Sequence, residues 1–345
     1  MTEHAAAGAT APAIELEGLG KIFGPAPRQH LQALRSGLDK VELQRRSGQV
    51  LALRDISLKL SGGAITVLMG LSGSGKSTLL RHINRLVEPT AGRVRCAGID
   101  VTALGAAALQ DFRRRHIAMV FQHFALFPHR NVLRNVGYAL EIRGVESTER
   151  DAVARRWIER VGLRGHEHSW PAQLSGGMRQ RVGLARALAG DVPVLLMDEP
   201  FSALDPLIRS EMQDLLLALQ HELRKTVVFV SHDLDEALRL GQQIVILREG
   251  MVVQQGNAAD IVLRPADDHV RRFAAGVNRG RALRCAMLAV PAPAVAGPTL
   301  AGHATLAEAA RILQAQGASQ ANVCDASGQA LGTITLQALI EQITA

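Results

Sequence analysis

The chain carries the stretch Gly70-Leu71-Ser72-Gly73-Ser74-Gly75-Lys76-Ser77-Thr78, and its fold can be predicted outward from there. The stretch matches the phosphate-loop pattern G-x-x-x-x-G-K-[ST] at every fixed position. An apolar, β-branched run precedes it at 64–69, and a segment with helical spacing follows it at 79–86. This is the strand, glycine loop and helix that the pattern requires, so a glycine-rich turn without a ligand is the less favoured interpretation.

The physical reason for this pattern is that glycines let the backbone curl until several N–H groups point at one anion. The N-terminus of the following helix adds partial positive charge at the same place. Lys76 would reach the outer phosphates of a nucleotide, and the Ser77 hydroxyl would bind Mg²⁺.

Length and composition limit the kinds of protein that this chain can be. Its 345 residues suggest roughly two domains. We find no apolar run near the ~20 residues that span a bilayer, and residues 1–12 do not have the pattern of a secretion signal. The cysteines Cys96, Cys285 and Cys324 are scattered and odd in number, which favours a reducing compartment. The formal charge of +7 is compatible with nucleic acid or an anionic membrane, but the arginines are spread along the chain.

Predicted strands alternate with predicted helices, which indicates an α/β fold with a largely parallel sheet core. Two predicted hairpins, at 92–98 and 244–254, give an antiparallel β edge. A basic helical insertion is predicted at 25–49, and residues from His123 to Leu184 form an inserted helical subdomain without strands. The remaining strands are predicted at 14–19, 51–60, 64–69, 117–121, 192–197 and 226–230.

The domain boundaries follow from changes in composition. Residues 1–13 are predicted to be a flexible N-terminus, 14–275 the main domain with its helical subdomain at about 123–184, and 276–298 an Ala/Pro-rich linker. Residues 299–345 are predicted to be a small α+β unit in the order helix, strand, turn, strand, helix.

Candidate site residues follow several buried strands at the edge where open α/β sheets bind ligands. They are Gly70, Gln122, Asp198 and His232. Asp198 could hold Mg²⁺ through water, and Glu199 beside it suits a general base that polarises an attacking water. His232 could bind a γ-phosphate. The alternatives are two solvated carboxylates and a structural histidine.

A second anion site is predicted within Leu174-Ser175-Gly176-Gly177-Met178-Arg179-Gln180. Ser175, Gly176 and Gly177 stand at the start of a predicted helix, where N–H groups and the helix dipole attract an anion. A serine N-cap without any ligand is the alternative.

Together these motifs resemble the ATP-binding cassette (ABC) ATPases, over about residues 14–275. The resemblance implies a P-loop NTPase-type core. It identifies 70–78 as Walker A, Gln122 as the Q-loop glutamine and 174–180 as the signature, with Met178 where the family pattern has Gln. It also identifies 194–199 as Walker B with the catalytic Glu199, 202–205 as the D-loop ending in Asp205, His232 as the switch histidine and Phe23 as the aromatic that stacks on adenine.

The family mechanism implies that ATP and Mg²⁺ bind to this chain. It assigns water positioning to Glu199 and charge stabilisation to Lys76 and His232. Ser77, Gln122 and Asp198 would hold the metal. Because the chain has one copy of each motif, the resemblance implies a head-to-tail homodimer, in which Ser175, Gly176 and Gly177 of one copy close the ATP on the other.

Several phrases and the insertion after Phe23 resemble the ATPase subunit of glycine betaine/proline/choline uptake systems. This implies integral-membrane permease partners, a substrate-binding protein met indirectly, no nucleic acid, and a peripheral place on the cytoplasmic face of the inner membrane. The segment with Phe124, Leu126 and Phe127 would meet the permease or, alternatively, belong to the core of the helical subdomain.

The C-terminal unit resembles a single cystathionine-β-synthase-like (CBS) repeat around 321–335. It could be a degenerate remnant or half of a pair completed across the dimer. Three alternatives to a quaternary amine importer stay open: an importer of another solute such as an amino acid, a soluble ABC ATPase of translation or DNA repair, and a nucleotide-sensing regulator without turnover. Glu199 argues against the regulator.

Overall fold

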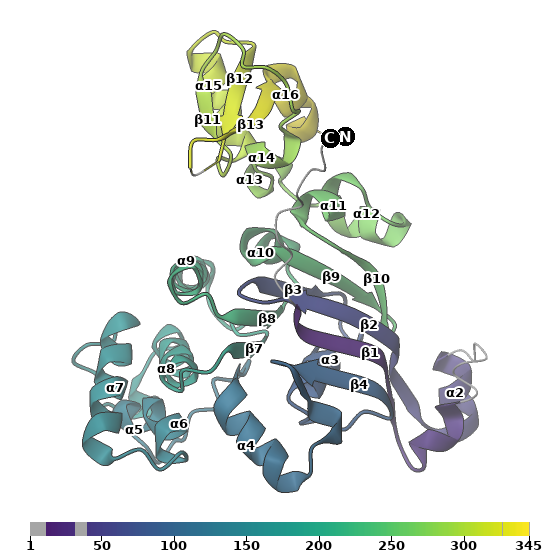
Figure 1. Ribbon diagram of the computed structural model, residues 1–345, viewed down its shortest axis with the longest axis vertical. Coiled ribbons are helices and arrows are strands. Elements are labelled where there is room, and N and C mark those ends of the chain that lie inside the picture. Colours follow the sequence, from purple (N-terminus) through teal and green to yellow (C-terminus); the bar gives the residue numbers. More distant parts are fainter. Residues whose placement is uncertain (1–11, 32–39, 326, 345) are drawn as a thin grey trace, which may run out of the picture. The chain divides into compact units, whose positions relative to one another are not determined.

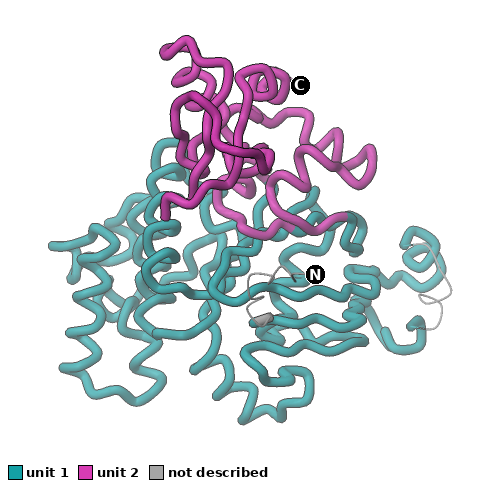
Figure 2. Tube along the Cα trace, turned by 45° about the horizontal axis from the view of Figure 1, so that its top comes forward, with its two compact units in different colours: residues 1–232, 245–253 teal, residues 233–244, 254–345 magenta. Residues whose placement is uncertain are grey.

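The structure is a computed structural model that describes residues 12–31, 40–325 and 327–344. The predicted flexible segment therefore lies almost entirely outside the described residues. The chain divides into two compact units: unit 1 comprises 1–232 and 245–253, and unit 2 comprises 233–244 and 254–345 (Figure 2).

A six-stranded sheet forms the centre of the fold, in the order β10-β9-β3-β8-β7-β6 (Figure 1). The pairs β3–β8, β8–β7 and β7–β6 are parallel. Every residue of β3, β7 and β8 is buried, as expected for strands covered on both faces. The prediction of a largely parallel core is confirmed. The strand bounds are β3 (Ile65–Met69), β6 (Ile117–Val120), β7 (Val194–Asp198), β8 (Thr226–Val230), β9 (Gln243–Arg248) and β10 (Met251–Gly256).

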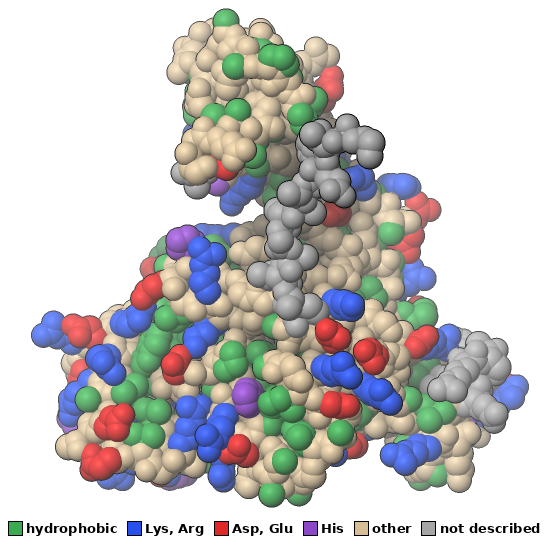
Figure 3. Space-filling model, in the orientation of Figure 1, with side chains coloured by type: hydrophobic (Ala, Val, Ile, Leu, Met, Phe, Trp, Pro, Cys, Tyr) green, Lys and Arg blue, Asp and Glu red, His purple; other side chains and the backbone are tan. Residues whose placement is uncertain are grey.

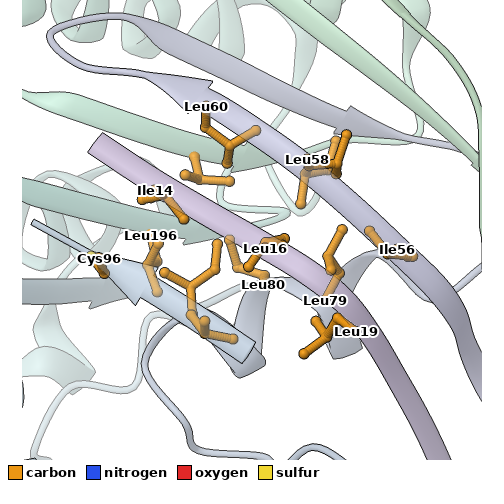
Figure 4. Packing of buried hydrophobic residues seen from close by; sticks show 14 of the residues in the cluster. Ile14, Leu16, Leu19, Ile56, Leu58, Leu60, Leu79, Leu80, Cys96 and Leu196 are labelled. Carbon is orange, nitrogen blue, oxygen red and sulfur yellow. The ribbon is translucent and has the colours of Figure 1, made fainter. Parts of the chain in front are cut away.

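A second sheet of four antiparallel strands has the order β2-β1-β4-β5. Its strands are β1 (Pro12–Phe23), β2 (Val50–Ser61), β4 (Ala91–Cys96) and β5 (Ile99–Asp100). Apolar side chains alternate along β1 and β2, so that one face of the sheet is buried. This face packs with helix α3 (Lys76–Ile83), and Figure 4 shows Leu79 and Leu80 of α3 among the side chains of both strands. The glycine loop is therefore followed by a helix that is fixed in the core.

Residues 121–193 contain helices and no strand, which confirms the inserted helical subdomain. The helices are α5 (Val132–Val136), α6 (Tyr138–Glu141), α7 (Ser147–Arg160), η3 (Pro171–Gln173) and α8 (Gly176–Ala189). They enclose a separate core, in which Val136, Ile158 and Val182 are fully buried. Within unit 1 these helices gather beside β7 in Figure 1.

Other helices connect the strands of unit 1. These are η2 (Val101–Ala103), α4 (Ala106–His116) and α9 (Pro206–Leu223). Asp205 is the N-cap of α9, since its carboxylate accepts the N–H of Ile208 at 3.1 Å. The insertion after Phe23 contains η1 (Pro27–His30) and α2 (Lys40–Ser47), and Leu43 of α2 packs on Ile22 and Leu51.

Unit 2 ends in a small three-stranded sheet of order β11-β12-β13. Strand β11 (Thr299–Ala301) was missed by the sequence prediction, because a three-residue strand is too short to show a periodic pattern; it pairs in parallel with β12 (Gln320–Cys324). The other elements are α10 (Leu234–Leu240), α11 (Ala258–Leu263), α12 (Asp268–Ala274), α13 (Arg279–Ala282), α14 (Cys285–Leu288), α15 (Leu306–Ala315), β13 (Ala330–Thr335) and α16 (Leu336–Thr344).

Two further observations bear on the sequence predictions. The segment 276–298 that was predicted as a linker includes the one-turn helices α13 and α14. Among the described helices, none has the length and apolar character needed to cross a membrane.

The buried face of α3 gives a test of the fold. Replacing Leu80, which is fully buried, in Leu80→Ala should lower the free energy of unfolding by about 2–5 kcal/mol, because a cavity is left in the core. The matched control Leu86→Ala removes a leucine that is 50% exposed and should have little effect. Urea denaturation followed by circular dichroism measures the difference, and equal effects of the two variants would contradict the packing.

Candidate functional site

The conformation of the glycine loop depends on three glycines with positive φ values. Gly70, Gly73 and Gly75 have φ values of 142°, 77° and 103°, a region that favours glycine. A Cβ on Gly70 would lie 2.2 Å from the carbonyl oxygen of Leu247, and one on Gly75 would lie 2.8 Å from that of Ala52. Backbone from β9 and β2 thus closes around the loop and fixes its curvature.

Lys76 and Ser74 are the two polar side chains of this loop that are buried. Lys76 is buried, and its Nζ donates to the carbonyl oxygens of Gly70 at 2.8 Å and Leu71 at 3.2 Å. Burial lowers the pKa of Lys76, while the carboxylates of Glu199 and Asp198 oppose that shift. The Oγ of Ser74 is buried and has no hydrogen-bond partner among the described residues. A phosphate in the loop would engage the Nζ of Lys76 and the hydroxyl of Ser74.

The loop is joined to strand β7 through Asp198, which is buried at the end of that strand. The Oγ of Ser77 donates to Oδ1 of Asp198 at 2.7 Å, and the guanidinium of Arg81 donates to Oδ2 at 3.1 Å. Ser77 and Asp198 are hard oxygen donors of the kind that Mg²⁺ prefers, so this pair fits a metal next to bound phosphate. Sequence reasoning missed Arg81, although its spacing from Ser77 on α3, i and i+4, places both on one helix face.

Glu199 and His232 form a second linked pair at the same edge of the sheet. The Nδ1 of His232 lies 3.1 Å from Oε2 of Glu199. Glu199 has a positive φ of 44°, and its N–H donates to the carbonyl oxygen of Val230 at 3.2 Å. A turn of this kind after β7 is uncommon for a non-glycine residue, and it directs the carboxylate toward the end of β8.

Gln122 reaches this pair through Ser202, a residue that the sequence analysis placed only within the D-loop. The Nε2 of Gln122 donates to Oγ of Ser202 at 3.3 Å, and that Oγ donates to the carbonyl oxygen of Glu199 at 3.0 Å. Contacts within unit 1 therefore link the glycine loop to Asp198, and Glu199 to His232 and Gln122.

Other predicted site residues stand apart from this group. In the described part of the chain, no hydrogen bond or ion pair joins the glycine loop to Phe23, Asp205 or residues 175–177. Phe23 is 42% exposed, with Nζ of Lys21 at 4.8 Å from the centroid of its ring. The carboxylate of Asp205 is occupied as a helix cap.

The signature segment is built as a helix N-terminus in the helical subdomain. The Oγ of Ser175 accepts the N–H of Met178 at 3.3 Å, which confirms the N-cap geometry. Gly177 lies against α9, where a Cβ would come within 2.6 Å of Cγ2 of Ile208. Met178 is partly buried against the helical core, so the side chain at this departure from the family pattern serves packing. The exposed Ser175 and the N–H groups of α8 do not meet the glycine loop of the same molecule.

The segment after Gln122 packs on the helical subdomain. Leu126 is half-buried against its core, and the ring of Phe127 lies 4.5 Å from that of Tyr138, measured between centroids. The guanidinium of Arg186 donates to the carbonyl oxygens of Ala125 at 2.7 Å and Phe124 at 3.2 Å. These contacts favour the core interpretation for Leu126 and Phe127.

The comparisons with known proteins agree with this geometry. The ABC transporter family model matches residues 53–202, which contain the glycine loop, the helical subdomain and Asp198–Glu199. The chain is similar to an Escherichia coli K12 protein, the glycine betaine/proline betaine transport system ATP-binding protein ProV, with 50% identity over 77% of this chain. It spans 66% of the length of that relative.

A second relative matches over nearly the full length of both chains. The trimethylamine N-oxide transport system ATP-binding protein TmoW of Ruegeria pomeroyi is 41% identical over 96% of this chain and 96% of its own. Among solved structures, the ATP-binding cassette MJ0796, in a dimeric post-hydrolysis state with ADP and Pi, superimposes with a TM-score of 0.60. The two sequences are 33% identical. The match covers 71% of this chain and 98% of the cassette.

The loop geometry predicts that Lys76 carries much of the nucleotide affinity. Lys76→Ala should weaken ATP binding by at least about tenfold, because a charge-assisted contact to the phosphates is lost. Titration with a fluorescent ATP analogue measures the change. Lys59→Ala, on the exposed side of β2, is the control for a lost lysine charge. Equal affinity of Lys76→Ala and the control would show that the loop does not bind the phosphates.

Proposed function

This chain belongs to the family of ABC transporter ATP-binding proteins, and from that premise we propose that it hydrolyses ATP to power the uptake of a quaternary amine. The solute would be of the glycine betaine, choline or proline betaine type and would pass through a separate permease. The proposal rests on two neighbouring side-chain contacts. Ser77 is hydrogen-bonded to Asp198, and Glu199, the next residue, contacts His232.

The residues of the glycine loop would hold ATP with Mg²⁺. Backbone N–H groups of 70–78 and Nζ of Lys76 would bind the phosphates, and the free Oγ of Ser74 would add a hydrogen bond. Ser77, Asp198 and Gln122 would hold the metal, which would neutralise developing charge on the phosphates. Phe23, with its exposed ring at the end of β1, would stack on the adenine.

The hydrolytic step follows from the second pair. Glu199 would orient the attacking water and accept its proton, because its carboxylate stands at the strand edge beside the phosphate loop. His232 would contact the γ-phosphate. The 3.1 Å contact between its Nδ1 and Oε2 of Glu199 would also hold the carboxylate of Glu199 in position. Gln122 would sense the nucleotide through Ser202.

A second copy of the chain would complete each site. Ser175, Gly176 and Gly177 form a helix N-terminus on the helical subdomain, which could bind a phosphate. In the described part of the chain, no hydrogen bond or ion pair joins them to the glycine loop of the same molecule. In a head-to-tail homodimer these residues would close over the partner's ATP, with Asp205 of the D-loop near the dimer contact. The dimeric, ADP- and Pi-bound state of the similar cassette supports this arrangement.

The permease would dock on unit 1 near Gln122, at the cytoplasmic face of the inner membrane. A groove of about 200 Å³ lies between α4, β6 and the helical subdomain, and its walls include Met119, Tyr138, Ile142 and Arg186. Arg186 also holds the segment 124–125 that follows Gln122, so a helix of the permease in this groove would be coupled to the nucleotide site.

The substrate-binding protein would act through the permease. No nucleic acid partner is proposed, since basic and acidic side chains are intermixed on the face that Figure 3 shows.

The assignment of Glu199 has a direct test. Glu199→Gln should lower the rate of ATP hydrolysis by about a hundredfold or more while ATP binding stays intact, because an amide cannot accept the proton. It should also trap an ATP-bound dimer, seen as a doubled mass in size-exclusion chromatography with light scattering. Glu222→Gln, on the surface of α9, is the control. Hydrolysis at the wild-type rate by Glu199→Gln would refute the role of Glu199.

The solute class is tested by transport. When the chain is reconstituted with the permease that co-purifies with it and its binding protein, ATP should drive uptake of radiolabelled glycine betaine or choline. The Glu199→Gln variant in the same vesicles should abolish the uptake. Accumulation of an amino acid such as methionine, with no uptake of quaternary amines, would favour the other importer class.

A further inference from the structure

Unit 2 contains a cleft whose chemistry the proposed ATPase reaction does not use. Its volume is about 400 Å³, and its walls come from α10, from α13 with the residue before it, and from the start of α15. All lining residues belong to unit 2. Those with a charge or a hydrogen-bonding side chain are Asp235, Arg239, Asn278, Arg281, Arg284 and Thr305.

The charge of the cleft is positive, because three arginines face one aspartate. The pKa of Asp235 is raised, first by partial burial and then by the neighbouring carboxylate of Asp233. The charged side chains that line the cleft are thus mainly guanidinium groups.

Arg281 and Arg284 are available to a ligand. In the described residues, neither guanidinium makes an ion pair or a hydrogen bond. The nearby carboxylate of Glu308 is occupied, since its Oε2 accepts both the N–H and the Oγ1–H of Thr305 at 2.9 Å. The charge of Arg284 contributes only a minor part of the lowered pKa of Glu308, after the hydrogen bonds from Thr305.

The backbone under these arginines is held in place before any ligand binds. Arg284 stands between Leu283 and Cys285, both fully buried. The N–H of Cys285 donates to the carbonyl oxygen of Ala304 at 2.9 Å, and the N–H of Leu306 donates to that of Leu283 at 3.2 Å. Such fixed backbone lowers the entropy that is lost when a ligand is bound.

We propose that this cleft binds a small organic molecule that carries a phosphate group, with Arg281 and Arg284 on the phosphate. Guanidinium groups match the geometry of phosphate oxygens with paired N–H donors. The volume exceeds that of a phosphate ion and lies in the range of small-molecule sites, which leaves room for an organic body. Asn278 supplies a polar side chain beside it, and Asp235 disfavours a second anionic group.

The test is an isothermal titration of the full-length protein with ribose 5-phosphate. The exposed Arg281 is replaced in Arg281→Ala, and Arg279→Ala is the matched control, because Arg279 lies on the same short helix without lining the cleft. Arg281→Ala should weaken binding by about tenfold, the loss of one charge-assisted contact, while Arg279→Ala should leave it unchanged.

Two more variants separate this cleft from the glycine loop. Lys76→Ala should retain ribose 5-phosphate binding, and Asp235→Asn should tighten it, since a repulsive carboxylate is removed. Loss of binding in Lys76→Ala alone would place the phosphate in the ATP site and overturn the proposal. No binding to the wild-type protein, or equal binding by Arg281→Ala and Arg279→Ala, would overturn it as well.

Discussion

The 2.7 Å hydrogen bond between Ser77 and Asp198 is the contact on which the site depends. It joins the first turn of the helix after the glycine loop to the end of the central strand β7. Both ends are fixed by packing, since α3 carries the buried Leu79 and Leu80 and every residue of β7 is buried. Both oxygen atoms of this contact thus belong to elements that are packed in the core, and Arg81 donates to the second carboxylate oxygen of Asp198.

The residues around this contact differ in how firmly they are held. Asp198 is buried, whereas the side chain of His232 is 60% exposed and meets Glu199 through a single contact. Residues 175–177 belong to a helical subdomain with its own core, separate from the core around α3. The residues of the proposed site therefore come from two separately packed parts of the chain.

Local sequence was sufficient for most elements, because their signals are local. The buried runs of β3, β7 and β8, the cap at Asp205 and the strand-free insertion all show in residue type and spacing. Strand β11 was missed because three residues are too few for a periodic pattern and its pairing with β12 is set by residues more than twenty positions away. Arg81 and Ser202 were missed as site contacts because an arginine on a helix and a serine in a turn carry no distinctive pattern.

The sequence alone determined the phosphate loop, the acidic pair Asp198–Glu199 and the glycine-serine start of α8, since each depends on residues adjacent in the chain. The tertiary structure decided which of them meet. It brought Ser77 to Asp198 and Glu199 to His232 because parallel strands end at one edge of the sheet. It also gathered the arginines of unit 2 around one cleft, which no local pattern shows, because α10 and α13 are far apart in sequence and adjacent only after folding.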